Sequence, residues 1–166
     1  MINQNPIKSF FTVWITLCIA FILTILPLSG WILWIRPQWV LLILFFWVVN
    51  TDGKIGLGTT FVAGIFLDLL TGTLLGQHSI IFCLLIYIML KINPRFRFFP
   101  LYQQTIIVLF LVWLNLVLNM GLMNFTGKYI DSSLYWLSAF LTALIWPFLS
   151  QWNKQKKNTS FSLHYN

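Results

Sequence analysis

The chain has 166 residues, of which 59% are hydrophobic and 8% are charged, and its mean hydropathy is +0.85. A soluble globular domain carries about 25% charged residues, so this composition excludes a water-soluble fold and predicts an integral membrane protein. The net charge of +7 is expected to follow membrane topology and not nucleic-acid binding, because no polar folded surface remains to carry a basic patch.

Six apolar segments follow one another along the chain, separated by short stretches with Gly, Pro or polar residues. They cover residues 10–26, 31–49, 55–75, 79–92, 104–123 and 134–152. A spanning helix takes about 20 residues, so we predict an all-α polytopic membrane bundle of six transmembrane helices over residues 1–152. The second and fourth segments are also compatible with re-entrant elements. A polar, basic tail follows over residues 153–166.

The chain begins with a short polar stretch that carries one lysine. The first apolar segment is long and lacks a small-residue cleavage site, so we expect it to stay as a span and not to be removed as a signal peptide. The free cysteines Cys18 and Cys83 lie in apolar runs, and we expect both to be buried packing residues.

The Lys and Arg residues fall unevenly on the two sides that six spans define. With the N-terminus in the cytoplasm, the opposite side holds only Arg36 and Lys128. The cytoplasmic side holds Lys8, Lys54, Lys91, Arg95, Arg97, Lys154, Lys156 and Lys157. Cytoplasmic loops are enriched in Lys and Arg, so we predict that both termini are cytoplasmic.

Small or polar residues recur at every fourth position of the third segment. They are Gly56, Thr60, Gly64, Asp68, Gly72 and Gly76. Small residues four apart let membrane helices approach closely, and on a helix they keep to one broad face from Thr60 to Gly72. We favour close packing inside the bundle, and a face for a specific partner helix is the alternative.

Asp68 is one of three acidic residues in the chain. An aspartate at a helix centre costs about 2.5–3.5 kcal/mol on insertion scales, so it needs a protein or water environment. The sequence NTDGK (50–54) predicts a turn, and Arg36 and Asp68 are equally distant from Asp52. We therefore predict that Arg36 pairs with Asp68, although Pro37 can bend the helix and misalign them. The alternative is that Asp68 faces a partner or a water-filled crevice.

Two further polar features invite a functional interpretation. Asn115 and Asn119 form one polar stripe on the fifth segment, and interhelical hydrogen bonding is favoured over ligand contact. The basic tail is expected to bind anionic lipid headgroups, with docking of a cytoplasmic protein as the alternative.

The inventory of reactive side chains argues against an enzyme. Nucleophilic or acid–base catalysis needs a base and an orienting group within hydrogen-bond reach. His78 is expected in a short outer loop and His164 near the C-terminus, and no two aspartates are placed to form a dyad. No HExxH, GxSxG or CxxC motif occurs, so we expect no catalytic residues, no metal and no cofactor.

A more specific indication comes from three stretches: RPQWVLLILFFW (36–47), GLGTTFVAGIFLDLLTGTLLGQHS (56–79) and LIWPFL (144–149). Together with the chain length and the basic tail, they resemble the MreD family of rod shape-determining integral membrane proteins of bacteria. The Arg-Pro pair and LDLLTGTLLG (67–76) are the most specific marks.

The resemblance implies a non-enzymatic scaffold in the bacterial inner membrane. It implies a periplasm-facing MreC-like partner and a link to MreB-type filaments and to the machinery that elongates peptidoglycan. The alternative is a substrate-binding membrane subunit of a vitamin-type uptake transporter. Such a subunit needs a pocket with convergent polar groups, and the outer side offers few of them.

Overall fold

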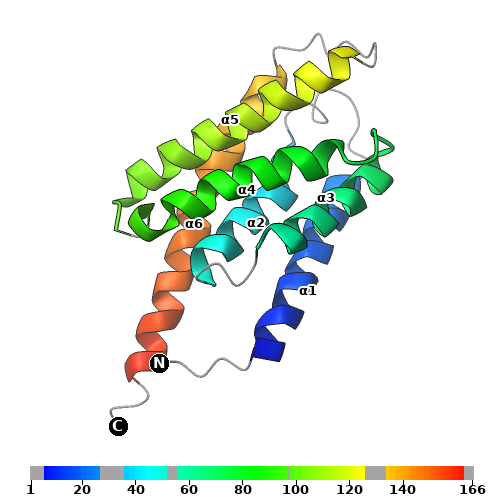
Figure 1. The fold of residues 1–166 in the computed structure, drawn as a ribbon. Coiled ribbons are helices and arrows are strands. Elements are labelled where there is room, and N and C mark those ends of the chain that lie inside the picture. The colour runs from blue at the N-terminus through cyan, green and yellow to red at the C-terminus, as the bar shows by residue number, and fades with distance from the viewer. Residues whose placement is uncertain (1–5, 27–35, 52–55, 97, 126–133, 163–166) are drawn as a thin grey trace.

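The computed structural model describes residues 6–26, 36–51, 56–96, 98–125 and 134–162, and all regular structure in these ranges is helical (Figure 1). The prediction of an all-α chain is confirmed. The helices are α1 (Pro6–Ile25), α2 (Trp39–Asn50), α3 (Leu57–Thr71), α4 (Gln77–Phe96), α5 (Leu101–Phe125) and α6 (Leu134–Ser162). Helix α3 packs most extensively with α4, and α5 with α6, whereas α2 and α3 make few contacts although they are neighbours in sequence.

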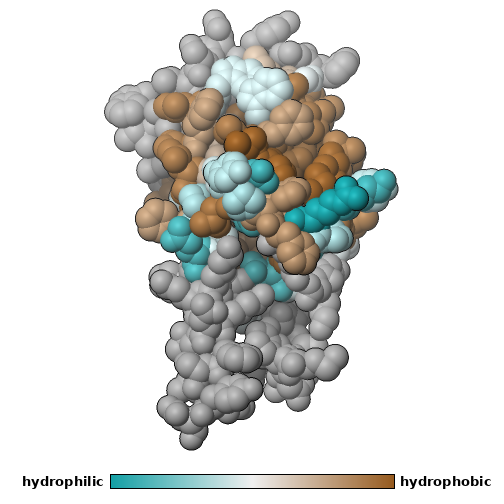
Figure 2. All heavy atoms as spheres, turned by 90° about the vertical axis from the view of Figure 1, so that its left-hand side faces the viewer, coloured by the Kyte–Doolittle hydropathy of each residue, from teal (hydrophilic) through white to brown (hydrophobic). Residues whose placement is uncertain are grey.

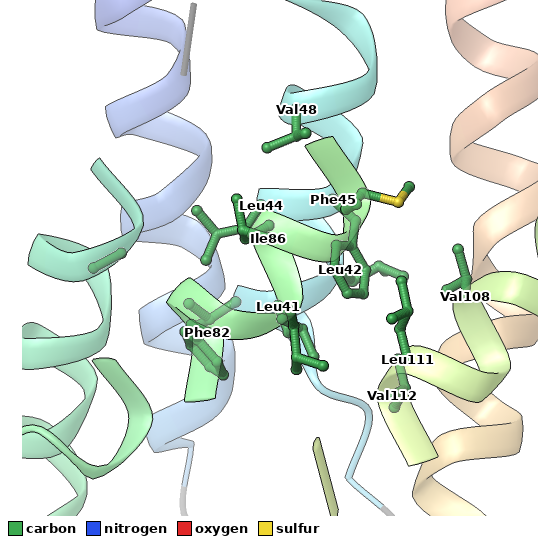
Figure 3. Packing of buried hydrophobic residues seen from close by; sticks show 14 of the residues in the cluster. Leu41, Leu42, Leu44, Phe45, Val48, Phe82, Ile86, Val108, Leu111 and Val112 are labelled. Atoms are coloured by element: carbon green, nitrogen blue, oxygen red, sulfur yellow. The ribbon is translucent and has the colours of Figure 1, made fainter. Parts of the chain in front are cut away.

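The short helix α2 is the centre of the bundle. It contacts α1, α4 and α6, and its sequence WVLLILFFWVVN is apolar on every side until Asn50. A helix that is hydrophobic all round is normally buried, and Leu41 and Phe45 are indeed fully enclosed. Figure 3 shows α2 side chains meeting Phe82 and Ile86 of α4 and the buried residues of α5.

Two predicted segments form shorter helices than expected. Helix α2 starts at Trp39 and not at residue 31, because Pro37 has no backbone N–H and restricts the residue before it. Residues 31–35 lie outside the described part of the chain. Helix α3 ends at Thr71 and not at residue 75, because Gly72 adopts the left-handed conformation with φ +64°.

The last helix is longer than the apolar segment that predicted it. Helix α6 continues to Ser162, so the first part of the predicted tail prolongs this helix. Helix α4 likewise extends to Phe96 and contains Pro94. Pro94 has no backbone N–H, so one helix hydrogen bond is missing near the end of α4.

Length and hydropathy mark two of the described helices as able to cross a membrane. These are α4, over Gln77–Phe96, and α5, over Leu101–Met123. The other apolar helical stretches are shorter, and the 12 residues of α2 extend about 18 Å against a hydrocarbon core of about 30 Å. This criterion therefore supports fewer spans than the six predicted.

The outward surface is apolar over much of the molecule. Figure 2 shows one face on which brown, hydrophobic side chains cover most of the coloured area and teal ones form small groups. Large exposed apolar side chains include Phe11, Ile15, Ile22, Phe66, Leu69, Ile106, Phe110 and Phe148. A surface of this kind fits contact with lipid or partner helices and not with bulk water.

The cysteines do not lie where the sequence predicted. Cys18 is exposed and Cys83 is half-buried, so the expectation that both are buried packing residues is wrong. The core-facing positions of α1 are Val13, Leu17 and Ala20, and Cys18 lies one position away from that face.

Candidate functional site

The connection between α3 and α4, residues 72–76, folds around the carboxylate of Asp68. Gly72 and Gly76 have φ of +64° and +94°, a region that favours glycine because it has no Cβ. The Gly72 N–H donates to the Asp68 carbonyl oxygen and so closes α3. The two left-handed glycines let the chain turn back so that α4 starts beside the end of α3.

The Asp68 side chain is fully buried and accepts hydrogen bonds from this connection. Its Oδ2 accepts from the Gly76 N–H at 2.8 Å, and its Oδ1 accepts from the Thr73 hydroxyl at 3.0 Å and the His78 N–H at 3.1 Å. The same Oδ1 lies 2.7 Å from His78 Nδ1, and the His78 side chain is 16% exposed. A buried carboxylate is tolerable when its oxygens are satisfied in this way.

This geometry explains why an aspartate interrupts an apolar helix. The first N–H groups of a helix have no partner within it and carry a partial positive charge. Asp68 supplies both an acceptor and a negative charge to the start of α4, where Gly76 and His78 present their N–H groups. The carboxylate therefore fastens the end of α3 to the beginning of α4.

The predicted ion pair of Arg36 with Asp68 is not formed, although the structure describes both residues. Arg36 donates to the carbonyl oxygens of Thr24 and Leu26 at the end of α1. Two causes are visible. Arg36 and Pro37 precede α2 and do not lie on it, and the oxygens of Asp68 are already occupied by its own loop and His78.

The row of small residues in the third segment divides into two groups. Gly56 precedes α3, and Gly72 and Gly76 shape the loop that follows it, so the continuous face expected as far as Gly72 ends at Asp68. Thr60, Gly64 and Asp68 are buried.

Gly64 marks the closest approach of α3 to α4. A Cβ added at Gly64 would lie 2.4 Å from the Cα atom of Ser79. This distance is far inside van der Waals contact, so only glycine fits at this position. The Ser79 hydroxyl donates to the Phe61 carbonyl oxygen at 3.1 Å, which adds an interhelical hydrogen bond beside the contact.

Asn115 and Asn119 belong to a chain of hydrogen-bonded groups that links α4, α5 and α6 with Gln38, the residue just before α2. Gln77 Nε2 donates to Asn119 Oδ1 at 3.1 Å, and Asn119 Nδ2 donates to Asn115 Oδ1 at 3.1 Å. Asn115 Nδ2 donates to Gln38 Oε1 just before α2, and the Gln38 N–H donates to the Thr142 hydroxyl of α6 at 3.0 Å. The amides of Asn115 and Asn119 are therefore satisfied by protein groups.

His78, Gln77, Gln38 and Thr142 were not among the predicted site residues. His78 was expected in a loop, and it lies in the first turn of α4. The sequence does contain one usable signal, since a glycine such as Gly72 commonly follows the last residue of a helix. That signal would have ended α3 before Gly76 and brought His78 within reach of Asp68.

The cluster of Asp68, Thr73 and His78 contains the residue types of a hydrolase triad in a different arrangement. In a catalytic triad the hydroxyl and the carboxylate face opposite ring nitrogens of the histidine. Here the Thr73 hydroxyl donates to Asp68 and lies 3.4 Å from Nδ1, the nitrogen that Asp68 already contacts. This geometry caps a helix and does not activate a nucleophile. No group of three potential metal ligands occurs among the described residues.

Comparison with known proteins gives two matches. The family described as "MreD: rod shape-determining protein MreD" matches residues 5–155. The rod shape-determining protein MreD of Haemophilus influenzae is 29% identical over 146 residues, which cover 86% of this chain and 88% of that protein. No solved structure matches.

Proposed function

Because this chain belongs to the MreD family of rod shape-determining proteins, we propose that it is a non-enzymatic, multi-pass scaffold of the cell-elongation machinery in the bacterial inner membrane. The observation that carries the proposal is the family match over residues 5–155. This range contains α1 to α5 and most of α6, so it covers the whole packed bundle.

The proposed arrangement has six crossings with both termini in the cytoplasm. Helices α4 and α5 are long and apolar enough to cross a membrane, and α1, α3 and α6 expose large apolar side chains on their outer faces. The uneven distribution of Lys and Arg supports the orientation. Helix α2 has no exposed residue, so protein covers most of its surface and its short length does not require lipid along its whole side.

This orientation predicts the outcome of cysteine labelling in intact cells. In a background with Cys18 and Cys83 replaced by Ser, a cysteine introduced at position 97 or 157 should resist a membrane-impermeant reagent added from the periplasm. A cysteine at position 128 should react, because six spans place it on the opposite side. Labelling at 97 or 157 as efficient as at 128 would refute the six-span orientation.

The partners proposed for the protein are an MreC-like periplasmic protein and, directly or indirectly, MreB-type filaments and the peptidoglycan elongation machinery. Their support is the family membership. The structure is compatible with a role without catalysis, since Asp68 and His78 fasten helix ends. The uptake-subunit alternative has no support from the comparisons, which match shape-determining proteins.

Depletion of the protein from a rod-shaped host tests the proposed role. We expect cells to lose rod shape and become round over the generations in which the protein is diluted, because elongation loses its scaffold. Membranes from the same cells should still polymerise peptidoglycan precursors in vitro, since no reaction depends on this chain. Depleted cells that keep normal length and width would contradict the proposal.

A further inference from the structure

A cavity of about 140 Å³ lies where four helix ends converge. Its lining includes Thr24 near the end of α1, Arg36 just before α2, Trp39 at the start of α2, Thr71 at the end of α3 and His78 at the start of α4. The remaining wall is formed by Gln38 and by apolar side chains. The cavity therefore combines a cation with an apolar lining at one end of the bundle.

The charge of Arg36 has no acidic partner within the described residues. Asp68 is the only carboxylate side chain in these ranges, since Asp52 and Asp131 lie outside them. Both oxygens of Asp68 are engaged by the loop and His78. Arg36 donates to two carbonyl oxygens, and its Nε is buried without a hydrogen-bond partner. A guanidinium has five donors in a planar fork, so donors remain for a ligand.

The cavity is partly open, and its volume of about 140 Å³ is smaller than the about 300–1,000 Å³ of sites for drug-sized ligands. Its interior therefore accommodates one small anionic group, and atoms attached to that group can extend out through the opening. The guanidinium fork matches phosphate oxygens.

We propose that this cavity binds a single phosphate group, with Arg36 as its main ligand and the apolar wall covering the atoms attached to it. The group comes from an anionic phospholipid headgroup or from a soluble phosphate. The lipid source follows from the proposed membrane position, because helix ends lie at the depth of the headgroups. An unpaired arginine next to apolar walls is unfavourable, and a bound phosphate compensates its charge.

The test uses the full chain purified in dodecyl maltoside, which contains no phosphate. Phosphatidylglycerol and inorganic phosphate are titrated separately, and binding is followed by the thermal unfolding midpoint and by native mass spectrometry. Arg36→Gln should weaken binding about 10–100-fold, as expected for the loss of hydrogen bonds to a charged group. Lys91→Gln is the matched control, because Lys91 is exposed and lies roughly 20 Å along α4 from His78.

A second variant separates ligand binding from folding. Thr71 is exposed and lines the cavity, so Thr71→Phe should obstruct the cavity and weaken binding while Arg36 keeps its contacts with α1. If Arg36→Gln does not fold, Thr71→Phe alone shows whether the ligand binds in this cavity.

Three outcomes are distinguishable. Saturable binding of phosphatidylglycerol that depends on Arg36 and on an open cavity supports the lipid source, and the same dependence for inorganic phosphate supports a soluble one. No saturable binding of either probe, or equal binding by wild type and the cavity variants, overturns the proposal. Binding by the purified protein is measured independently of cell shape, so a failed depletion test and a failed binding test are separate results.

Discussion

Replacing Gly64 by Ala is expected to destabilise the folded protein by about 3 kcal/mol, the upper part of the usual range for overpacking. The added Cβ would lie 2.4 Å from Ser79 Cα and 2.6 Å from Ser79 N. These are backbone atoms of α4, so no side-chain rotation can relieve the clash and the two helices must separate. Small residues hold membrane helices together through this kind of close approach.

Gly58→Ala is the matched control on the same helix. A Cβ at Gly58 meets nothing within 4 Å, and Ala is favoured over Gly in a helix by about 1 kcal/mol. The free energy of unfolding of both variants can be measured by denaturant titration in detergent micelles. We expect Gly58→Ala to be neutral or slightly stabilising, and equal stability of the two variants would refute the close α3–α4 contact.

Replacing Asp68 by Ala is expected to lower the free energy of unfolding by about 3–5 kcal/mol. The change removes the acceptor for the half-buried Gly76 and His78 N–H groups and the Thr73 hydroxyl, and a donor left unsatisfied costs about 1–3 kcal/mol when it is buried. Asp68→Asn keeps one acceptor oxygen and should have a smaller effect. Denaturant titration of the purified variants measures both changes.

Double-mutant cycles identify the partner of Asp68. His78 Nδ1 lies 2.7 Å from Asp68 Oδ1, so the effects of Asp68→Ala and His78→Ala should be less than additive. The effects of Asp68→Ala and Arg36→Ala should be additive, because those side chains share no contact. Coupling of Asp68 with Arg36 and none with His78 would contradict the structure.

The sequence was sufficient to predict the helical class and the order of the helices. The 12-residue helix α2 and the end of α3 were predicted poorly, because apolar length alone does not show where Pro37 and Gly72 interrupt a segment. Spacing by four residues also fits a continuous helix. Gly72 is itself a member of this four-residue pattern, so the pattern did not show that α3 ends there.

The buried polar contacts were harder to predict than the helices. The need of Asp68 for a protein environment followed from the cost of a carboxylate in an apolar helix. The hydrogen-bond partners of Asp68 could not be predicted in this way, because they depend on two left-handed glycines that reverse the direction of the chain. The contact of Gln38 with Thr142 joins residues 104 positions apart, and sequence periodicity does not specify how helices so far apart face each other.

The most direct test of this account is cell width after depletion of the native protein and supply of a single variant. Wild type and Gly58→Ala should restore rods of normal width, whereas Gly64→Leu, with its larger side chain against the backbone of Ser79, should leave cells round. Cells that remain rod-shaped without any copy, or that regain normal width with Gly64→Leu, would contradict a shape-determining protein built on the close contact of α3 with α4.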